Sequence, residues 1–252
     1  MVDLNQNSEK HTVRAVERAL DILLCFTEAS ELGLAQITKK VSLHKSTVFR
    51  LLQTLEQKGF IIKNSETEKY RLGYRILELS NHLSGINDPA ILFLPEMQRL
   101  RNEVDETISL YVRDGLDRIR IQAIESEQPI RRVAPIGARM PLYVGAASKV
   151  LVTFENPIER SSIMDKLEAQ QMIDRVSFEE MINEIRSNGF ATSFEERELG
   201  AASIAVPIFN KSKKLIAAIS ISGPVNRLTH EKMNNNIKEL LEVASQLSNL
   251  IH

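Results

Sequence analysis

The sequence predicts an α+β protein with two domains, the first made of three short helices and a hairpin and the second of mixed helices and strands. The chain has 252 residues, and about 100–200 residues per domain is usual. It is 43% hydrophobic and 26% charged, which is ordinary for a globular protein and excludes a disordered or collagen-like chain. Apolar residues recur with a helical period up to residue 57 and with mixed periods after Pro89.

Three helices are expected within the first domain. Residues 1–10 are polar and are predicted to be a flexible tail. The first helix begins at Val13, and a break at 30–33 separates it from a short second helix. Ser42 and Leu43 form a tight turn into the third helix. Its apolar stripe, spaced i, i+3, i+4 and i+7, consists of Val48, Leu51, Leu52 and Leu55.

A hairpin follows the third helix. Lys58-Gly59 is a typical helix end, with a cation in the last turn before glycine. Residues 60–62 and 69–72 read as strands joined by a polar turn. Three helices and a hairpin in this order indicate a winged helix-turn-helix over residues 11–73.

A linker helix is predicted within 74–88, because helical spacing continues after Gly73 and fades before Pro89. Residues 89–252 form the second domain. Strands are predicted at 108–113, 118–124, 130–135, 190–194, 201–209 and 215–222, with helices near 92–104, 146–154, across 157–188 and from Thr229.

The charge is distributed unevenly along the chain. The total is 32 Lys+Arg against 33 Asp+Glu, a net charge of -1. Residues 1–72 hold 11 basic and 9 acidic residues, whereas the remainder is acidic. Five of the basic residues and one acid lie within 36–61. A near-neutral total therefore does not exclude nucleic-acid binding by the first domain.

The polar face of the third helix suits the DNA major groove. Opposite the leucine stripe it carries Ser46, Arg50, Gln53 and Gln57. Arg50 and Gln53 are the expected base-reading residues, because Arg and Gln side chains reach base edges. Phosphate contacts and groove entry are expected from Lys45, Ser46 and Thr47, from Lys39 and Lys40 of the second helix, and from Lys69 or Arg71 of the wing.

Catalysis, a metal site and a cofactor are not expected. The five histidines are isolated, and no G-x-G-x-x-G, P-loop or G-x-S-x-G motif is present. The single cysteine, Cys25, lies in the first domain. Glu195 and Glu196 are adjacent, and on a strand adjacent side chains point to opposite faces.

A small-molecule pocket is expected instead in the second domain. Ser220 and Ser222 are two residues apart on one predicted strand, so both hydroxyls project from one face. Ser203 lies within another apolar strand. Gly145-Ala146 precedes a predicted helix, whose bare N–H groups suit an anion. The alternative is that these serines face water on a half-exposed sheet.

Several of these segments, taken together, resemble one family. They are Leu43-His44-Lys45-Ser46-Thr47-Val48-Phe49-Arg50-Leu51-Leu52-Gln53-Thr54-Leu55, Gly59-Phe60, Tyr70-Arg71-Leu72-Gly73, Gly189-Phe190-Ala191, Glu195-Glu196, Gly200 and Ile219-Ser220-Ile221-Ser222-Gly223-Pro224. The chain resembles the IclR family of bacterial transcription regulators over nearly its whole length. His44 departs from a proline that is common in the family.

The resemblance implies a GAF-like effector-binding domain that takes small organic acids. The ligand positions that it implies fall on Gly145, Ala146, Ser193, Ser203, Ser220 and Ser222. Ser193 stands where an acidic residue is frequent, Ser203 where cysteine is frequent, and Ser148 where glycine is common. The identity of the effector is thus the property that transfers least well.

The sequence as a whole indicates a cytoplasmic regulator without a membrane segment. Its expected partners are double-stranded DNA with a palindromic operator, a small-molecule effector and further copies of itself in a homodimer or tetramer. The linker helix is expected to couple the two domains. The alternative is a metabolic enzyme or ligand-sequestering protein whose winged helix serves protein contacts.

Overall fold

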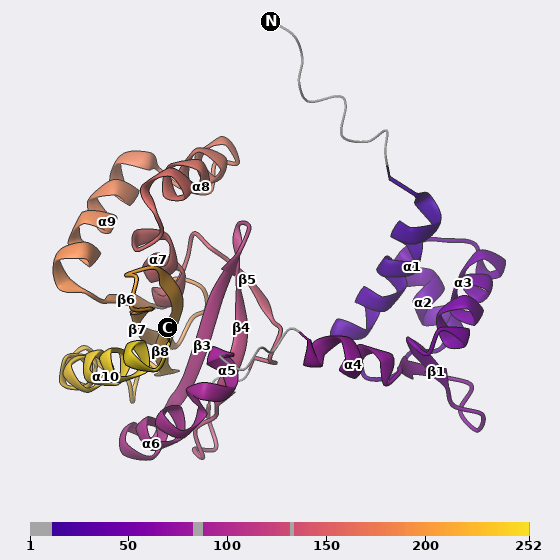
Figure 1. Ribbon diagram of the computed structural model, residues 1–252, viewed down its shortest axis with the longest axis horizontal. Coiled ribbons are helices and arrows are strands. Elements are labelled where there is room, and N and C mark those ends of the chain that lie inside the picture. The colour runs from indigo at the N-terminus through magenta and orange to yellow at the C-terminus, as the bar shows by residue number, and fades with distance from the viewer. Residues whose placement is uncertain (1–11, 83–87, 132–133, 252) are drawn as a thin grey trace, which may run out of the picture. The chain divides into compact units, whose positions relative to one another are not determined.

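The structure is a computed structural model that describes residues 12–82, 88–131 and 134–251 (Figure 1). Within it, the residues up to 82 form one compact unit and those from 88 onward form another. The predicted tail, 1–10, lies outside the described residues, as do 83–87 at the end of the predicted linker.

The N-terminal unit has the predicted order of elements. Ser42, in the left-handed conformation with φ 53°, makes the tight turn into α3, and Gly59, at φ +76°, follows the end of that helix. The elements are α1 (Arg14–Leu24), η1 (Cys25–Thr27), α2 (Leu34–Val41), α3 (Lys45–Gln57), β1 (Ile61–Lys63), β2 (Tyr70–Leu72) and α4 (Arg75–Asn81).

The core of this unit lies between α1, α2, α3 and the hairpin. Ile22, Ile37, Val48 and Leu52 are each fully buried. Cys25 is buried beside them, and its Sγ donates to the Asp21 carbonyl oxygen at 3.3 Å. The predicted stripe of α3 is thus its core face, which turns the opposite, polar face outward.

The C-terminal unit is a six-stranded antiparallel sheet with helices on both faces (Figure 1). The strand order is β5-β4-β3-β8-β7-β6. Its elements are α5 (Pro89–Leu92), α6 (Leu94–Val104), β3 (Thr107–Asp114), β4 (Asp117–Ile124), β5 (Arg139–Pro141), α7 (Ala146–Thr153), α8 (Pro157–Ala169), α9 (Arg175–Asn188), β6 (Ala191–Phe194), β7 (Ala201–Phe209), β8 (Leu215–Pro224) and α10 (His230–Leu250).

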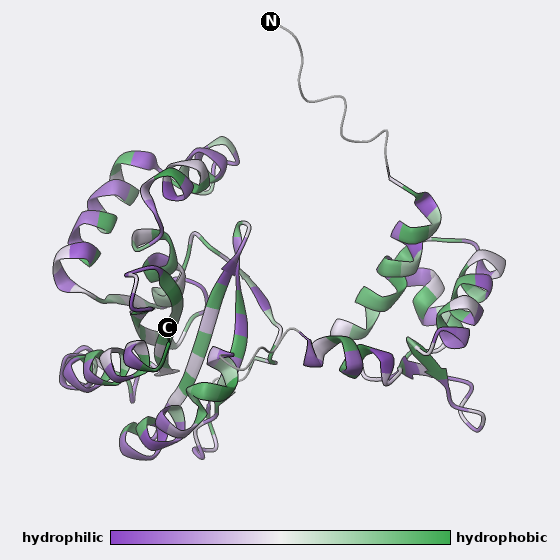
Figure 2. Ribbon diagram, viewed as in Figure 1, coloured by the Kyte–Doolittle hydropathy of each residue, from purple (hydrophilic) through white to green (hydrophobic). Residues whose placement is uncertain are grey.

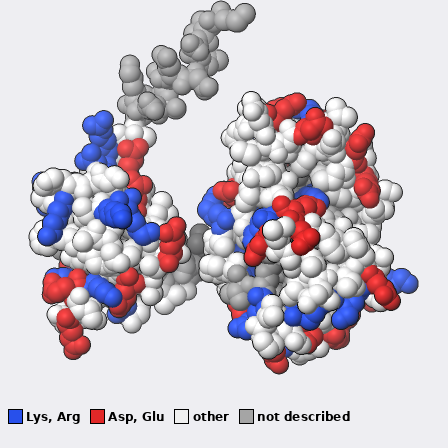
Figure 3. Space-filling model, turned by 180° about the vertical axis from the view of Figure 1, so that it is seen from behind, with Lys and Arg blue, Asp and Glu red and all other residues white. Residues whose placement is uncertain are grey.

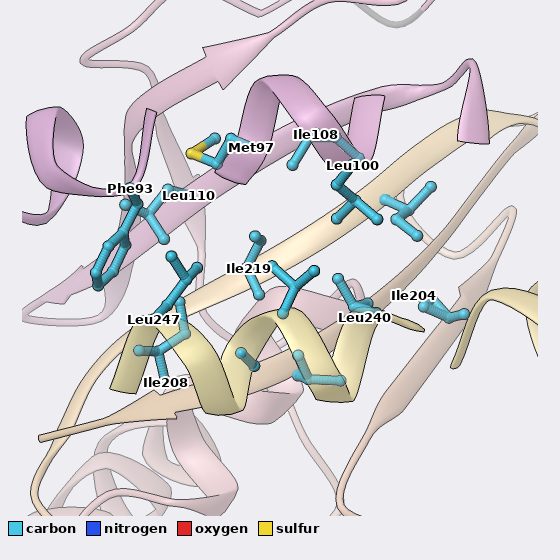
Figure 4. Packing of buried hydrophobic residues seen from close by; sticks show 14 of the residues in the cluster. Phe93, Met97, Leu100, Ile108, Leu110, Ile204, Ile208, Ile219, Leu240 and Leu247 are labelled. Carbon is cyan, nitrogen blue, oxygen red and sulfur yellow. The ribbon is translucent and has the colours of Figure 1, made fainter. Parts of the chain in front are cut away.

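The two faces of the sheet belong to different clusters of buried residues. Helices α6 and α10 cover one face, where Leu100, Ile108, Ile219 and Leu240 meet (Figure 4). Helices α7, α8 and α9 pack on the opposite side. Hydrophobic and hydrophilic residues alternate along β3 and β4 (Figure 2), as expected for strands whose two faces differ. That alternation gives the α7 side of the sheet small and polar residues.

Two predicted elements of the second domain differ from the structure. The described residues of 130–135 form no strand, and the short strand of this region is β5. The carbonyl oxygens of Ile130 and Ala134 accept hydrogen bonds from Arg227 and Arg120, so this segment is held by side chains instead of a strand partner. The helix predicted near 92–104 is interrupted at Phe93, which separates α5 from α6. Nowhere in the described part of the chain is a helix long and apolar enough to cross a bilayer.

Candidate functional site

The outward face of α3 carries the polar residues that the sequence places there. Ser46, Arg50 and Gln53 are exposed, and Thr47 is half-buried. His44 is the N-cap residue of α3, and its Nδ1 lies 3.0 Å from the Ser46 Oγ. The first turn of α3 therefore presents backbone N–H groups and hydroxyls beside the exposed arginine, an arrangement suited to phosphates.

An open hollow of about 380 Å³ runs along this face. Arg18 of α1 contributes to it, which places a second guanidinium beside Arg50 in the same hollow. Arg18 is not among the residues expected from the sequence, because its position on α1 does not reveal that it shares a hollow with the polar side of α3. The lining residues are Ala15, Arg18, Thr47, Arg50, Leu51, Gln53, Thr54 and Gln57.

The lysines predicted to contact phosphate have different surroundings. Lys40 is paired with Glu28 at 2.6 Å, and this hydrogen bond raises the pKa of Lys40 above its ordinary value. Lys39, Lys45 and Lys69 are exposed. A phosphate could therefore approach these three lysines directly, whereas it would have to compete with Glu28 for Lys40.

The wing and the wider surface carry mixed charges. Lys63 of β1 pairs with Glu68 of the turn, and the Arg71 guanidinium lies 5.8 Å from the centre of the Tyr74 ring. Positive and negative side chains are intermingled over the visible faces of both units (Figure 3). A face of mixed charge gives little long-range attraction to a polyanion.

The C-terminal unit contains a cavity of about 40 Å³ at the α7 side of the sheet. Five of the six residues that the resemblance implies line it: Gly145, Ser193, Ser203, Ser220 and Ser222. The sixth, Ala146, is buried but is not among the lining residues, whereas Ala147 is. The structure thus brings together residues from β6, β7, β8 and the start of α7.

The strand register explains how the serines meet. Ser193 lies opposite Ser203, and Ser203 lies opposite Ser222, so one row of hydroxyls crosses β6, β7 and β8. In the next row Ser220 lies opposite Ser109 of β3. Directly opposed residues share a face of an antiparallel sheet. These hydroxyls therefore form one polar patch that is mostly out of water.

Two arginines of β4 line the same cavity, and neither is among the residues expected from the sequence. Arg118 is 6% exposed; its Nη1 donates to the Val144 carbonyl oxygen at 2.9 Å and to the Ser148 Oγ at 2.5 Å. Arg120 is 2% exposed and donates to the Ser109 Oγ. Burial lowers the pKa of the Arg120 guanidinium below its ordinary value. The alternation of Arg118-Ile119-Arg120 is the same period-two signal that identified Ser220 and Ser222.

The N-terminus of α7 already holds a carboxylate of this chain. The Gly145 N–H donates to the Glu196 Oε2 at 3.3 Å, and Lys149 pairs with the same carboxylate. Gly145 has φ +91°, and a Cβ there would lie 2.9 Å from the Arg118 Nη1. Glycine is thus required both by the backbone conformation and by the close approach of Arg118.

The adjacent carboxylates of Glu195 and Glu196 are directed to different partners. They lie in the turn after β6, with Glu195 at φ 54°, and not on a strand as the sequence analysis assumed. Glu195 accepts from the Gly200 N–H at 2.7 Å, whereas Glu196 turns to Gly145. No cluster of three or more metal-ligating side chains occurs among the residues that the structure describes.

Both units match models of one protein family. The IclR helix-turn-helix domain matches residues 15–65, and the C-terminal domain of the bacterial transcriptional regulator IclR matches residues 88–249. The transcriptional regulator XynR of Escherichia coli is 31% identical over 245 residues, which cover 94% of this chain and 96% of that protein. The regulator KdgR of Escherichia coli is 29% identical over 253 residues, covering 98% and 96%.

A solved structure has the same fold. It is the IclR homologue of Microbacterium hydrocarbonoxydans complexed with 4-hydroxybenzoate, which matches with a TM-score of 0.81 and 20% sequence identity. The match covers 94% of this chain and 98% of that one. The helix-turn-helix unit, the α/β unit with its antiparallel sheet and the two domain matches agree. The chain belongs to the IclR family of bacterial transcription regulators.

Proposed function

We propose that this protein is a sequence-specific DNA-binding transcription regulator whose operator binding is modulated by a small organic acid. The observation that carries the proposal is the outward face of α3, where Arg50 and Gln53 are exposed on the side opposite the fully buried Val48 and Leu52. A helix anchored in this way can enter the major groove with its long polar side chains toward the base edges.

The residues of the first unit divide into two roles. Arg50 and Gln53 read bases, while Ser46 and Thr47 in the first turn of α3 hold a phosphate together with Lys45. Arg18 shares the hollow with Arg50 and is an additional phosphate contact. Lys39, Lys69 and Arg71 flank the groove; Lys40 contributes only if it exchanges Glu28 for a phosphate.

A gel-shift assay with the DNA upstream of the protein's own gene tests this function. The expected result is a shift that survives an excess of random competitor DNA. A shift that random DNA abolishes equally well, or no shift at saturating protein, would contradict the regulator function and favour a ligand-sequestering protein.

A homodimer or tetramer on a palindromic operator is part of the proposal. The exposed side of α1 supports it, because Val16, Leu20 and Leu24 form an apolar stripe and are 55%, 54% and 61% exposed. A second copy of the chain that covers this stripe would place two copies of α3 on two half-sites. Sedimentation of the protein with and without operator DNA measures the number of copies.

The effector is proposed to bind in the cavity beside α7. Buried hydroxyls and two guanidiniums converge there, and a few polar groups in a mostly buried pocket are typical of small-molecule sites. The structural neighbour from Microbacterium carries an organic acid, 4-hydroxybenzoate, which supports the same class here. The double substitution Ser220→Leu and Ser222→Leu should remove the effector response and leave operator binding unchanged.

In this proposal the protein catalyses no reaction and acts in the cytoplasm, where its DNA target lies.

Coupling between the DNA-binding face of α3 and the effector cavity is proposed to pass through α4 and the linker region of 74–88. Substitution of the exposed Leu77 and Leu79 of α4 should then weaken the effector response without changing the effector affinity. An unchanged response would place the coupling elsewhere.

A further inference from the structure

Arg120 has an unusual environment for a buried cation. It is 2% exposed, and its Nε and Nη2 donate to the Ser109 Oγ at 3.2 and 2.9 Å. Its Nη1 donates to the carbonyl oxygen of Ala134. A guanidinium has five N–H groups. One N–H on each terminal nitrogen therefore has no acceptor among the described residues, and the guanidinium lines the cavity.

No carboxylate of the described residues forms an ion pair with Arg120. Glu125, whose charge acts on Arg120, pairs with Arg131 at 3.1 Å. Glu198, which lines the same cavity, lies 3.7 Å from Arg197. Burial, and to a smaller extent the neighbouring Arg197, holds the pKa of Arg120 below its ordinary value. A buried cation whose only acceptors are neutral is costly, because its lost hydration is not replaced by an opposite charge.

Two partly buried arginines of the same unit, in contrast, have a carboxylate partner. Arg227 forms a bidentate pair with Glu106 at 2.7 and 2.9 Å, and Arg113 pairs with Glu155 at 2.9 Å. These arginines hold the fold together and carry their counter-charge with them. Among the described residues Arg120 lacks such a partner, and it lines a cavity.

The other charge-binding features of the cavity are already engaged by the protein. The Gly145 N–H at the start of α7 donates to Glu196, so this helix end holds a carboxylate of its own chain. Arg118 donates to Val144 and Ser148 and lies 5.1 Å from the centre of the Tyr111 ring, which fixes it against the start of α7. Arg197 also lines the cavity, but it is exposed and lies 3.7 Å from Glu198. Arg120 is buried at this cavity and keeps two N–H groups without an acceptor among the described residues.

We infer that Arg120 binds the carboxylate of the effector and is the residue that makes this pocket selective for acids. The inference rests on the proposed function, which assigns the cavity to a small-molecule effector. An arginine fork can hold both carboxylate oxygens, and a ligand would supply the opposite charge that the fold omits. Ser109 positions the fork, since it accepts from both Nε and Nη2.

The rest of the ligand is constrained by the serine rows and by the size of the cavity. Beyond Arg120 the lining offers the hydroxyls of Ser203, Ser220 and Ser222, which pair with hydroxyl or keto oxygens. The cavity volume of about 40 Å³ is well below the volume of about 150 Å³ that holds a benzene ring in a protein core. The site as it stands therefore suits a compact aliphatic acid with further oxygen atoms better than an aromatic acid.

Matched acids and amides test this assignment on the full-length protein. Thermal unfolding of the C-terminal unit is followed in lactate and glycerate, in the corresponding amides lactamide and glyceramide, and in chloride at equal ionic strength. The wild type should be stabilised saturably by at least one acid and by neither amide. Arg120→Gln and Arg120→Met should lower the apparent affinity for that acid by about tenfold or more.

Two further variants make the outcome specific to the fork. Arg120→Lys keeps the charge and loses the planar fork, so its affinity should lie between those of the wild type and Arg120→Gln. Arg139→Gln removes an exposed arginine whose partners are Asp114 and Asp117, and its response should equal that of the wild type. If Arg120→Gln and Arg120→Met fail to fold, the loss measured in Arg120→Lys decides the question.

Three results would overturn the inference: an unchanged acid response in a folded Arg120 variant, equal stabilisation by acid and amide, or no stabilisation of the wild type by either acid. Operator binding in the same chloride buffer separates this from the proposed function. Wild type and Arg120→Met should both bind operator without acid. A wild type that binds no operator contradicts the regulator function, whereas the acid–amide comparison still decides the role of Arg120.

Discussion

Glu106 and Arg227 form a bidentate ion pair across 121 residues of sequence, with N–O distances of 2.7 and 2.9 Å. Glu106 is 8% exposed at its side chain and Arg227 is 26% exposed. Gly223 makes room for the pair, because a Cβ at this position would collide with the Glu106 carboxylate. The Arg227 Nη2 also donates to the Ile130 carbonyl oxygen at 2.8 Å, so this one pair fixes three parts of the domain.

Glu106→Gln should destabilise the C-terminal unit by about 2 kcal/mol, because it leaves the Arg227 guanidinium without its counter-charge. The expected loss is below that of a fully buried pair, since Arg227 is a quarter exposed. Urea unfolding followed by circular dichroism measures it. Glu96→Gln, which removes a partner of Arg99 that is 33% exposed at its side chain, is the control and should change the free energy of unfolding by less than about 0.5 kcal/mol. Equal effects of the two substitutions would contradict this prediction.

Gly73→Ala should unfold the wing or the whole N-terminal unit, at a cost of about 3 kcal/mol or more. A Cβ at Gly73 would lie under 3.0 Å from the carbonyl carbon and oxygen of Gly59, which are backbone atoms and cannot move aside as a side chain can. Gly33→Ala is the matched control, because its Cβ would meet only the Gln36 Oε1 at 3.5 Å. Thermal unfolding of both variants should leave Gly33→Ala near the wild type; a stable Gly73→Ala would refute the close approach.

Glu239→Gln should stabilise the protein near pH 7 and have no effect near pH 4. A hydrogen bond with the Glu103 carboxyl raises the pKa of Glu239, and the same contact lowers the pKa of Glu103. The raised pKa means that the favourable form of Glu239 is the protonated one. Its contribution is present at low pH and is lost as the pH rises from the ordinary glutamate pKa through the raised one.

At neutral pH the two carboxylates therefore repel each other, and glutamine removes that repulsion. The gain should be small, about 0.5 kcal/mol, because Glu103 and Glu239 are 40% and 36% exposed and water screens them. Unfolding midpoints measured from pH 4 to 8 give the profile. Glu184→Gln, an exposed position on α9, should show no such pH dependence. A gain that persists at pH 4 would point to a cause other than charge.

Arg50→Ala should weaken binding to the operator by about 1–3 kcal/mol and leave the stability of the protein unchanged. Arg50 is exposed on α3, so its loss removes a base contact without disturbing the core. Lys45→Ala is the companion variant and should weaken operator and random DNA alike, with a lower salt dependence. Fluorescence anisotropy with both DNAs compares them; an equal loss for Arg50→Ala would make Arg50 a phosphate contact.

The sequence predicts the elements of this protein better than the contacts between them. Helix α3 carries its own signals, the apolar stripe with Val48 and Leu52 and the stop at Gly59, so both its bounds and its outward face follow from local pattern. The segment 130–135 carries the apolar pattern of a strand, yet the carbonyl oxygens of Ile130 and Ala134 accept from Arg227 and Arg120. Such long-range partners are invisible to a periodicity argument.

The effector site shows the same division. Ser220 and Ser222 follow from the period of two within β8, whereas Ser193 and Ser203 join them only through the register of β6, β7 and β8. Arg120 could have been found from its alternation with Arg118. What the alternation could not supply is the side of the sheet on which it lies, since the opposite face of β4 is also partly buried.

The buried Cys25 allows the opening of the N-terminal unit to be measured by the reaction rate of its thiol. It is the single cysteine of the chain, and burial raises the pKa of its thiol, so the reactive thiolate is scarce while the helices are closed. The rate of alkylation by iodoacetamide then counts openings of the DNA-binding unit alone, whatever the other unit does. Operator DNA should slow this alkylation. A ligand bound in the effector cavity should change the alkylation rate if its binding alters the opening of the N-terminal unit.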